Sequence, residues 1–179
     1  MWWKVIAEWV ILIIQFGLAI FMFYMMAAFY TGAPLVLTRR KIIKKMLDEA
    51  GLKPGQLFIE LGCAEGRVLR TAVKDYHVRG MGYEINFFLV WWGRIMAGLQ
   101  HLKNIRFIVK NFWKADLSGA DVIYAYLFPD TMQKLKVIFD KTGKKNLLVI
   151  SRVFEIKGWE NKLIKKIPEG DDWIYYYRK

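Results

Sequence analysis

The first feature of the chain is an apolar stretch from Trp9 to Tyr30 that contains no charged residue. As a helix it would be roughly 33 Å long, enough to cross the hydrocarbon core of a bilayer. Trp2 and Trp3 precede the stretch and Phe29 lies near its far end, as in interfacial aromatic belts. A cleaved signal peptide is the alternative, but the stretch is too long and no clean small-residue cleavage site follows it. We therefore predict an N-terminal transmembrane anchor over residues 1–32.

Beyond residue 32, short apolar runs alternate with segments of helical periodicity. The runs that predict strands are 57–61, 78–83, 105–110, 121–126, 147–153 and 173–177. The segments that predict helices are 42–50, 67–76, 87–99 and 131–139. This alternation favours an α/β domain over residues 33–179, with a doubly wound, mostly parallel, Rossmann-like sheet.

Two of the predicted helices have features of their own. Thr38 is expected to cap the first, which Gly51 ends. The helix over residues 87–99 is apolar nearly all round. Its aromatic residues would be buried inside the domain or would lie at a bilayer interface, and burial is the favoured interpretation.

Charge changes this picture in one respect. The net charge is +12, which indicates an anionic partner, either lipid head groups or nucleic acid. The cations gather at 39–45, directly after the apolar stretch, so the positive-inside rule places residues 39–179 in the cytoplasm of a single-pass membrane protein. With Cys63 as the one cysteine and two histidines in the chain, neither an internal disulfide nor a metal site is expected.

The candidate chemistry lies where the first two predicted strands end. Glu60 is followed by a turn that contains Gly62 and Gly66, and small residues there let a ligand approach the backbone closely. Glu84 ends the next strand, where a carboxylate accepts hydrogen bonds from ribose hydroxyls. A dinucleotide is disfavoured because Arg67 stands where the pyrophosphate pattern needs a glycine. The pattern therefore predicts a nucleoside ligand without a pyrophosphate.

These motifs resemble the class I S-adenosylmethionine-dependent methyltransferases. More narrowly, they resemble the small membrane-anchored group related to the mitochondrial lysine methyltransferases of the ATP synthase c-subunit and the adenine nucleotide translocase. The similarity extends from 33–38 through 52–67, 82–86 and 111–118 to 120–123. It implies S-adenosylmethionine as methyl donor, without a metal.

The resemblance also implies site residues. Glu60, Gly62 and Gly66 would hold the methionine end of the cofactor, Glu84 the ribose, and Asn111 with Phe112 the adenine. The complete cofactor set implied is Thr38, Glu60, Gly62, Cys63, Ala64, Gly66, Glu84, Ile85, Asn111 and Phe112. Ala64 replaces the family's usual middle glycine, and its methyl group is tolerated if the backbone there is not left-handed.

The acceptor site is expected at the end of the fourth strand. Tyr124, Tyr126 and Phe128 would share one face by two-residue alternation, leading to Pro129. Our hypothesis is that Tyr126 and Phe128 form an acceptor wall that contacts an ammonium group by cation–π attraction, and core packing is an equally good interpretation.

The resemblance favours a lysine of a membrane-associated protein as acceptor. One alternative is an RNA or small-molecule methyltransferase. Nucleic acid is disfavoured because the cations gather beside the predicted anchor and no nucleic-acid-binding module is recognisable. A non-catalytic protein that binds S-adenosylmethionine is the other alternative.

Overall fold

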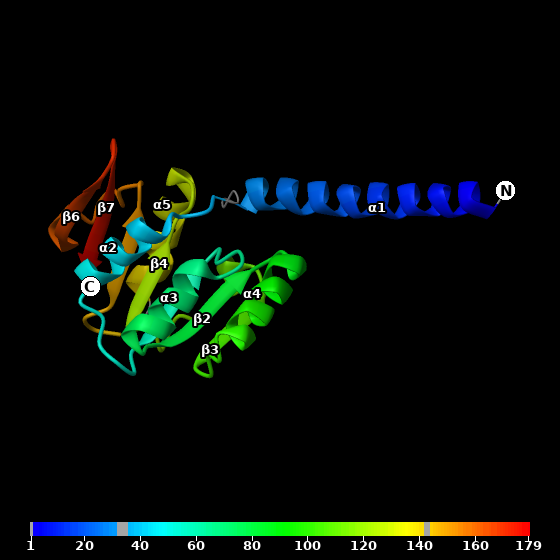
Figure 1. The fold of residues 1–179 in the computed structure, drawn as a ribbon. Coiled ribbons are helices and arrows are strands. Elements are labelled where there is room, and N and C mark those ends of the chain that lie inside the picture. The colour runs from blue at the N-terminus through cyan, green and yellow to red at the C-terminus, as the bar shows by residue number, and fades with distance from the viewer. Residues whose placement is uncertain (1, 32–35, 142–143) are drawn as a thin grey trace.

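The structure is a computed structural model that describes residues 2–31, 36–141 and 144–179. The predicted boundary between the anchor (residues 1–32) and the domain (residues 33–179) lies outside the described residues. A long helix, α1 (Trp2–Thr31), leads to an α/β domain built on one seven-stranded sheet (Figure 1).

The sheet has the strand order β3-β2-β1-β4-β5-β7-β6. Its first five strands pair in parallel, whereas β7 is antiparallel to both of its neighbours. The strands are β1 (Leu57–Leu61), β2 (Arg79–Glu84), β3 (Ile105–Val109), β4 (Val122–Ala125), β5 (Leu148–Arg152), β6 (Leu163–Glu169) and β7 (Asp172–Arg178). The predicted doubly wound, mostly parallel sheet is therefore confirmed.

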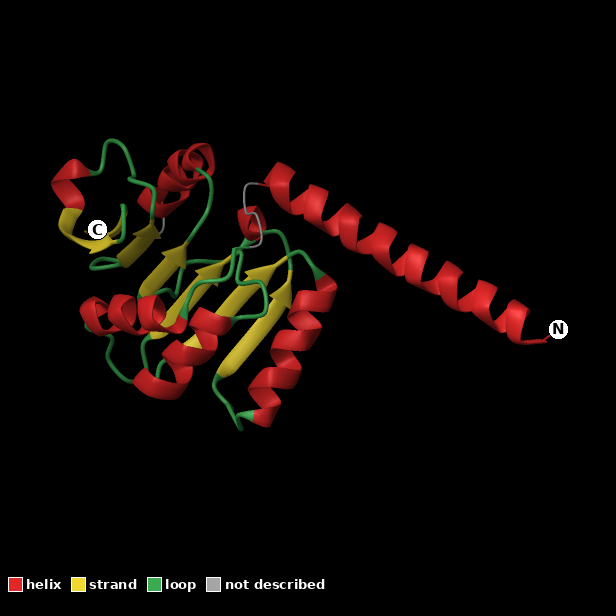
Figure 2. Cartoon of the chain, turned by 45° about the horizontal axis from the view of Figure 1, so that its top comes forward, coloured by secondary structure: helices red, strands yellow, loops and turns green. Residues whose placement is uncertain are grey.

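Helices cover both faces of the sheet (Figure 2). They are α2 (Arg40–Ala50), α3 (Arg67–Tyr76), α4 (Phe87–Leu99) and α5 (Pro129–Lys141), with the short 3-10 helices η1 (Phe112–Lys114) and η2 (Glu160–Lys162). One buried cluster joins α2, α3 and α4 to the sheet, and includes Ile43, Leu69 and Val90. A second joins α5 to the opposite face around Phe139 and Trp159. Both faces are thus buried, as a parallel sheet requires.

The order of the strands places the candidate site. From β1 the chain adds β2 and then β3 on one side of that strand, and it then crosses back to add β4 on the other side. The order of the strands therefore reverses at β1. In sheets of this kind, ligands bind at such a switch point, outside the carboxyl ends of the strands. Leu61 in β1 pairs with Tyr83 in β2 and Ala125 in β4, which brings these three strand ends together.

The N-terminal helix meets the expectation for a membrane span. Residues Trp2–Tyr24 have a mean hydropathy of 2.3, and none of the most apolar part is buried against the rest of the protein. By length and composition this helix can cross a bilayer. Figure 1 shows it leaving the domain as a straight rod.

Three sequence predictions are wrong in detail. Thr38 does not cap α2: the cap is Arg39, and the Thr38 hydroxyl instead accepts a hydrogen bond from Arg152 Nη1 (3.1 Å). The strand β6 is missing from the prediction because its charged residues and Pro168 hide the alternation of half-buried and exposed side chains. The fourth strand ends at Ala125, so the alternation does not extend to Phe128.

The prediction that the aromatic residues of 87–99 are buried inside the domain is also wrong. Phe87, Phe88, Trp91 and Trp92 are each about half exposed, at 47%, 52%, 52% and 49%. The helix itself is correct, and Asn86 caps it by accepting from the N–H groups of Phe88 and Leu89.

Candidate active site

The turn after β1 is fastened to the next strand by its backbone. Gly62 and Cys63 both donate their N–H groups to the carbonyl of Tyr83, at 2.9 and 3.1 Å. Gly62 and Gly66 have φ angles of +71° and +72°, a left-handed conformation that glycine adopts without steric cost. A β-carbon at Gly66 would also overlap the Phe107 ring. Both glycines are therefore needed for the shape of this turn.

Ala64 shares the left-handed conformation, with a φ of +48°. The methyl group of Ala64 was expected to be tolerated only if the backbone there is not left-handed, and this condition is not met. A non-glycine residue in this conformation carries roughly 1–2 kcal/mol of strain. Its N–H group donates to Glu84 Oε2 at 3.0 Å. Since a carboxylate is a strong acceptor, this bond helps to hold the strained residue in place.

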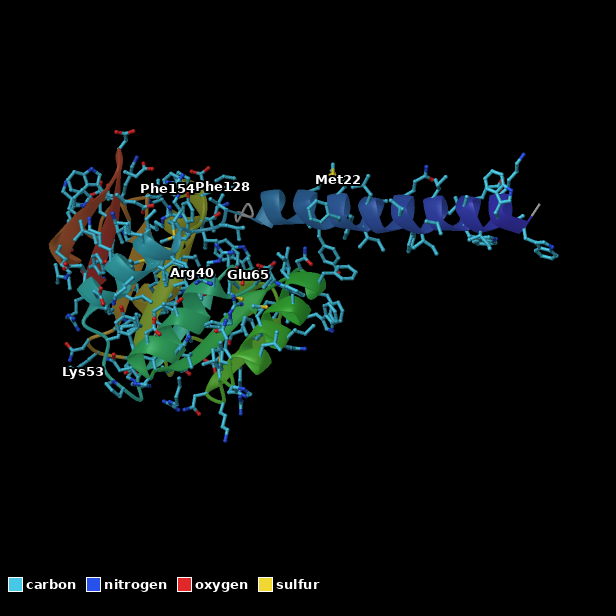
Figure 3. All side chains as sticks on the ribbon, in the orientation of Figure 1. Met22, Arg40, Lys53, Glu65, Phe128 and Phe154 are labelled. Carbon is cyan, nitrogen blue, oxygen red and sulfur yellow. The ribbon has the colours of Figure 1, made fainter. Side chains whose placement is uncertain are left out.

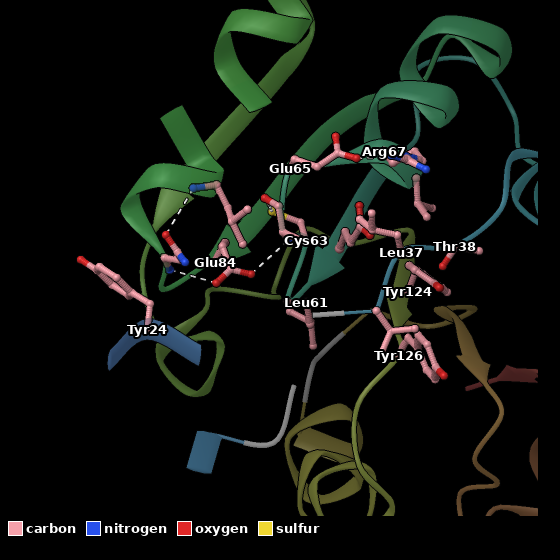
Figure 4. Close-up of a pocket in the computed structure, with 17 residues that line it drawn as sticks. Tyr24, Leu37, Thr38, Leu61, Cys63, Glu65, Arg67, Glu84, Tyr124 and Tyr126 are labelled. Atoms are coloured by element: carbon pink, nitrogen blue, oxygen red, sulfur yellow. Dashed lines mark hydrogen bonds and ion pairs between the residues drawn. The ribbon is translucent and has the colours of Figure 1, made fainter. Parts of the chain in front are cut away.

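Glu84 connects the two strand ends (Figure 4). Its side chain is buried, with Oε2 accepting from Ala64 and Oε1 accepting from the Asn86 N–H group at 2.9 Å. A carboxylate has about four acceptor positions, so two remain for a ligand. The geometry suits a ligand that presents a pair of hydroxyl groups.

Glu60 is the second buried carboxylate of the site, and only 5% of the residue is exposed. Its Oε2 accepts from the Leu69 N–H group in the first turn of α3, at 2.9 Å. Burial raises the pKa of the Glu60 carboxyl well above its ordinary value, and the nearby Glu65 and Glu84 raise it further. A cation placed beside Glu60 would favour its ionised form.

These groups open onto one pocket at the ends of β1, β2 and β4. Seven of the sequence-predicted site residues line it: Thr38, Glu60, Gly62, Cys63, Ala64, Glu84 and Tyr126. The enclosed part measures about 60 Å³. Ligand pockets are generally roughly 300–1,000 Å³, so a nucleoside would also extend along the open edge of the strand ends.

The other residues predicted for the cofactor site do not line this pocket. Ile85 follows Glu84 directly, and Gly66 closes the turn. Asn111 comes after β3, where its side-chain oxygen caps η1 by accepting from the Trp113 N–H group at 3.0 Å. Phe112 is buried against Trp113, with 5.2 Å between ring centroids. The roles proposed for these residues in adenine binding stay predictions.

The three residues predicted for the acceptor site separate after β4. Tyr126 lines the pocket, whereas Phe128 and Pro129 lead into α5. The Arg152 guanidinium lies 4.3 Å from the centre of the Tyr126 ring, and Phe154 stacks beside that ring at 6.4 Å. Because the protein's own cation already covers part of this ring, an acceptor ammonium would have to use its remaining surface.

Sequence analysis did not assign a role to several groups in the pocket or, like Arg152, in contact with one of its walls. Tyr124 is buried at its wall, and burial raises the pKa of its hydroxyl, which therefore stays protonated and can donate a hydrogen bond. The alternation in β4 is the signal for Tyr124, whereas no local signal marks Arg152. Tyr24 in α1 also lines the pocket, together with Leu37. The long helix thus contributes to the wall of the site.

Comparison with known families identifies the chain. Residues 60–163, more than half of it, match the family described as the ANTKMT methyltransferase domain. The chain belongs to this family. It is an S-adenosylmethionine-dependent methyltransferase in fold and class, as the sequence predicts.

Individual relatives agree with this assignment. A protein-lysine N-methyltransferase of Saccharolobus islandicus is 31% identical over 153 residues, which cover 80% of this chain and 92% of that protein. The lysine N-methyltransferase of the ATP synthase c-subunit from Xenopus laevis is 28% identical, and the match spans 80% of this chain and 61% of that protein. The methyltransferase therefore covers most of the first relative but about three fifths of the second.

A solved structure gives the same fold. The RNA methyltransferase from Salinibacter ruber, in complex with S-adenosyl-L-homocysteine, superposes with a TM-score of 0.76 at 26% identity. The match covers 80% of this chain and 93% of that one.

The residues of this methyltransferase fit S-adenosylmethionine. Two buried carboxylates lie at adjacent strand ends, one able to face an amino group and the other a pair of hydroxyls. Between them, the left-handed Gly62 carries no side chain that would keep a ligand from the backbone. Glu60 and Gly62 would hold the methionine end, and Glu84 the ribose.

The raised pKa of Glu60 predicts how stability depends on pH. The folded state holds this proton more tightly than the unfolded state, so folding stability falls as the pH rises from about 4.3 through the raised pKa. Glu60→Gln, which stays neutral, should therefore raise the free energy of unfolding at neutral pH, by about 1.4 kcal/mol for each unit of pKa shift. Below the ordinary glutamate pKa this gain should vanish.

Thermal or urea unfolding of the full chain in detergent, measured across pH, checks this expectation. Glu49→Gln is the matched control, since Glu49 is exposed. A Glu60→Gln variant that is less stable than the parent at every pH would contradict it.

Proposed function

We propose that this methyltransferase is a membrane-tethered enzyme that methylates a lysine side chain of a membrane-associated protein. The names of the relatives from Saccharolobus islandicus and Xenopus laevis support lysine as the acceptor. The apolar helix Trp2–Tyr24 supports the tether. The single observation that carries the proposal is that Tyr24 of this helix lines the same pocket as Glu60 and Glu84.

In this proposal residues 1–32 are the anchor and residues 33–179 the catalytic domain. The cations at 39–45 would lie on the cytoplasmic side, in accordance with the positive-inside rule. A tether of this kind raises the effective concentration of acceptors in the same bilayer. The enzyme would then gain more from its anchor with a membrane-protein acceptor than with a soluble one.

Within the site, each group of the chain has one task. When bound, S-adenosylmethionine supplies a methyl group on a positively charged sulfur. Glu60 would face the amino group of the cofactor, and the turn at Gly62 would allow close backbone contact. Glu84, already held by Ala64 and Asn86, would accept from the ribose hydroxyls without having to reorganise. Such preorganisation is what alignment for an in-line transfer requires.

The acceptor lysine must lose a proton before it can attack. Its ordinary pKa is about 10.4, and both desolvation and a nearby positive charge lower that value. The buried Tyr124 forms a wall that would exclude water, Leu37 adds an apolar rim that is 54% exposed, and the Tyr126 ring would contact the ammonium group. No catalytic triad is needed for this chemistry.

Glu84→Ala tests the cofactor site. The change removes the hydrogen bonds that the ribose hydroxyls would donate to this charged acceptor. Each is worth about 1.5–3 kcal/mol, so S-adenosylmethionine binding should weaken by at least tenfold. Isothermal titration of the full chain in detergent measures this, with Glu155→Ala as the control because Glu155 is exposed. If the folded Glu84→Ala enzyme binds the cofactor as tightly as the parent, the ribose assignment is wrong.

Tyr126→Ala and Phe128→Ala test the acceptor wall. A cation–π contact in a desolvated site is worth about 2 kcal/mol, so Tyr126→Ala should raise KM for the acceptor by roughly 10- to 30-fold. Phe128→Ala removes a ring that does not line the pocket and should raise this KM less. The KM for S-adenosylmethionine should change little. Trp173→Ala, which removes an exposed aromatic ring elsewhere, is the control. Unchanged turnover and acceptor affinity in the folded variants would leave these rings as core packing.

A labelling experiment tests the acceptor class. The full chain is incubated with membrane extract and S-adenosylmethionine carrying a labelled methyl group, and the products are hydrolysed. We expect the label in methylated lysine from membrane proteins. Label in RNA would support the alternative suggested by the Salinibacter ruber structure. Cofactor binding without any transfer would mean that the chain is a binding protein.

A further inference from the structure

The helix α4 turns its small residues toward the sheet and its large apolar residues away from it. Val90, Gly93 and Ala97 are buried. A β-carbon on Gly93 would lie 2.9 Å from both the Glu65 carbonyl oxygen and the Phe107 ring, so the helix packs closely at that point. The burial of α4 against the sheet therefore requires none of its aromatic side chains.

The outer face of α4 is a continuous apolar stripe. We call it the α4 stripe, and it consists of Phe87, Phe88, Trp91, Trp92, Ile95, Met96 and Leu99. Five of its members are exposed, from 47% for Phe87 to 69% for Leu99. The outer face of a helix on a soluble domain is normally polar, and a contiguous apolar patch indicates an interaction surface.

A basic groove borders the stripe. It measures about 590 Å³ and lies between α2, α3 and α4. Leu89, Trp92 and Met96 of α4 form its apolar side. The charged residues that line it are Arg40, Lys44, Glu65, Arg67, Arg70, Lys74 and Asp75.

The cations of the groove are not all balanced within it. Arg67 and Arg70 pair with Glu65, at 3.0 and 2.7 Å. Lys44 pairs with the exposed Asp48 outside the groove lining, at 3.2 Å. Figure 3 labels Glu65 and Arg40 on this side of the domain, where both line the groove. Cations outnumber carboxylates along this groove, so it attracts a negatively charged surface.

The stripe begins beside the last part of the candidate membrane span. Phe88 contacts Tyr24 edge to face, with 6.1 Å between ring centroids, and Tyr24 is the last residue of the candidate span. Figure 1 shows α4 starting beneath the end of α1. If α1 crosses a bilayer, as the proposed function holds, the first turns of α4 lie at the depth of the lipid head groups.

We propose that the N-terminal half of the α4 stripe and the basic groove dock on the surface of an anionic bilayer. This inference rests on the tether of the proposed function. Aromatic side chains at head-group depth beside lysines and arginines are typical of interfacial helices. Single-stranded RNA could also meet aromatic and basic groups, but the contact with the span and the aliphatic members Ile95 and Leu99 favour lipid.

Docking would also set where the site opens. The groove and the cofactor pocket share Leu37, Glu65, Arg67 and Leu89 as walls. A bilayer against the stripe would therefore place the mouth of the pocket beside the head groups. Lysines of membrane proteins within a short distance of the bilayer surface would be the acceptors in reach, and those on long soluble domains would not.

Spin labels in the full chain test the proposal. Trp91→Cys and the control Val137→Cys place a nitroxide at positions of similar exposure, 52% and 54%, on α4 and α5. Cys63 is buried and provides little background, which labelling of the parent chain checks. The chain is placed in nanodiscs of neutral lipid or of neutral plus anionic lipid. Accessibility to oxygen is compared with accessibility to a water-soluble nickel complex.

We expect the label at 91 to be reached more by oxygen than by nickel in anionic nanodiscs, and the label at 137 to behave in the opposite way. Lys44→Glu with Lys74→Glu should weaken this signal at 91, whereas Lys134→Glu with Lys141→Glu on α5 should not. The proposal would be overturned if the labels at 91 and 137 had the same relative accessibility to oxygen and nickel, whether both were in water or both in lipid. The proposal would also be overturned if the label at 91 became less accessible to nickel only when RNA was added.

The same samples are assayed for cofactor binding and lysine methylation. A failure of docking alone leaves both activities in place. If the proposed function is wrong, no methyl group is transferred to lysine, whatever the accessibility of the spin label. The two results are therefore distinguishable.

Discussion

The carboxylate of Glu84 is the interaction on which the site depends. It accepts one N–H group from the turn after β1 and another from the entry to α4, and so joins two segments that the chain order separates. Removal of this side chain would leave two backbone donors without a charged partner, and Ala64 would lose a bond that offsets its left-handed strain. The same carboxylate therefore stabilises the fold of the site and is available to bind the ligand.

Glu60 illustrates the opposite effect of burial. Its single bond to the Leu69 N–H group does not offset the loss of water around the carboxylate, so its pKa rises. A group of this kind destabilises the folded protein at neutral pH until a cation arrives beside it. A positively charged ligand beside Glu60 would therefore remove part of the free-energy cost of burying this carboxylate.

Local patterns were sufficient for most of the fold and for part of the site. The helix over 67–76 and the strand over 57–61 have the predicted bounds, because their periodicity and flanking glycines are local signals. Thr38 shows the limit: its hydroxyl bonds to Arg152, which is distant in sequence, and no local pattern reports such a contact. The aromatic rings of α4 show a second limit of local patterns. The apolar composition suggested that the rings are buried, but the small residues Gly93 and Ala97 already make the contact with the sheet.

Residues of β5 and of the last hairpin hold Thr38 and the helix α2. Arg152 donates to Thr38 and is itself paired with Glu169 in β6, whose Pro168 carbonyl accepts from Lys45. These partners lie near the end of the chain. During synthesis, Thr38 and Lys45 are therefore made long before Arg152, Pro168 and Glu169, which hold them. Thr38 and the start of α2 are therefore among the last parts of the domain to be fastened.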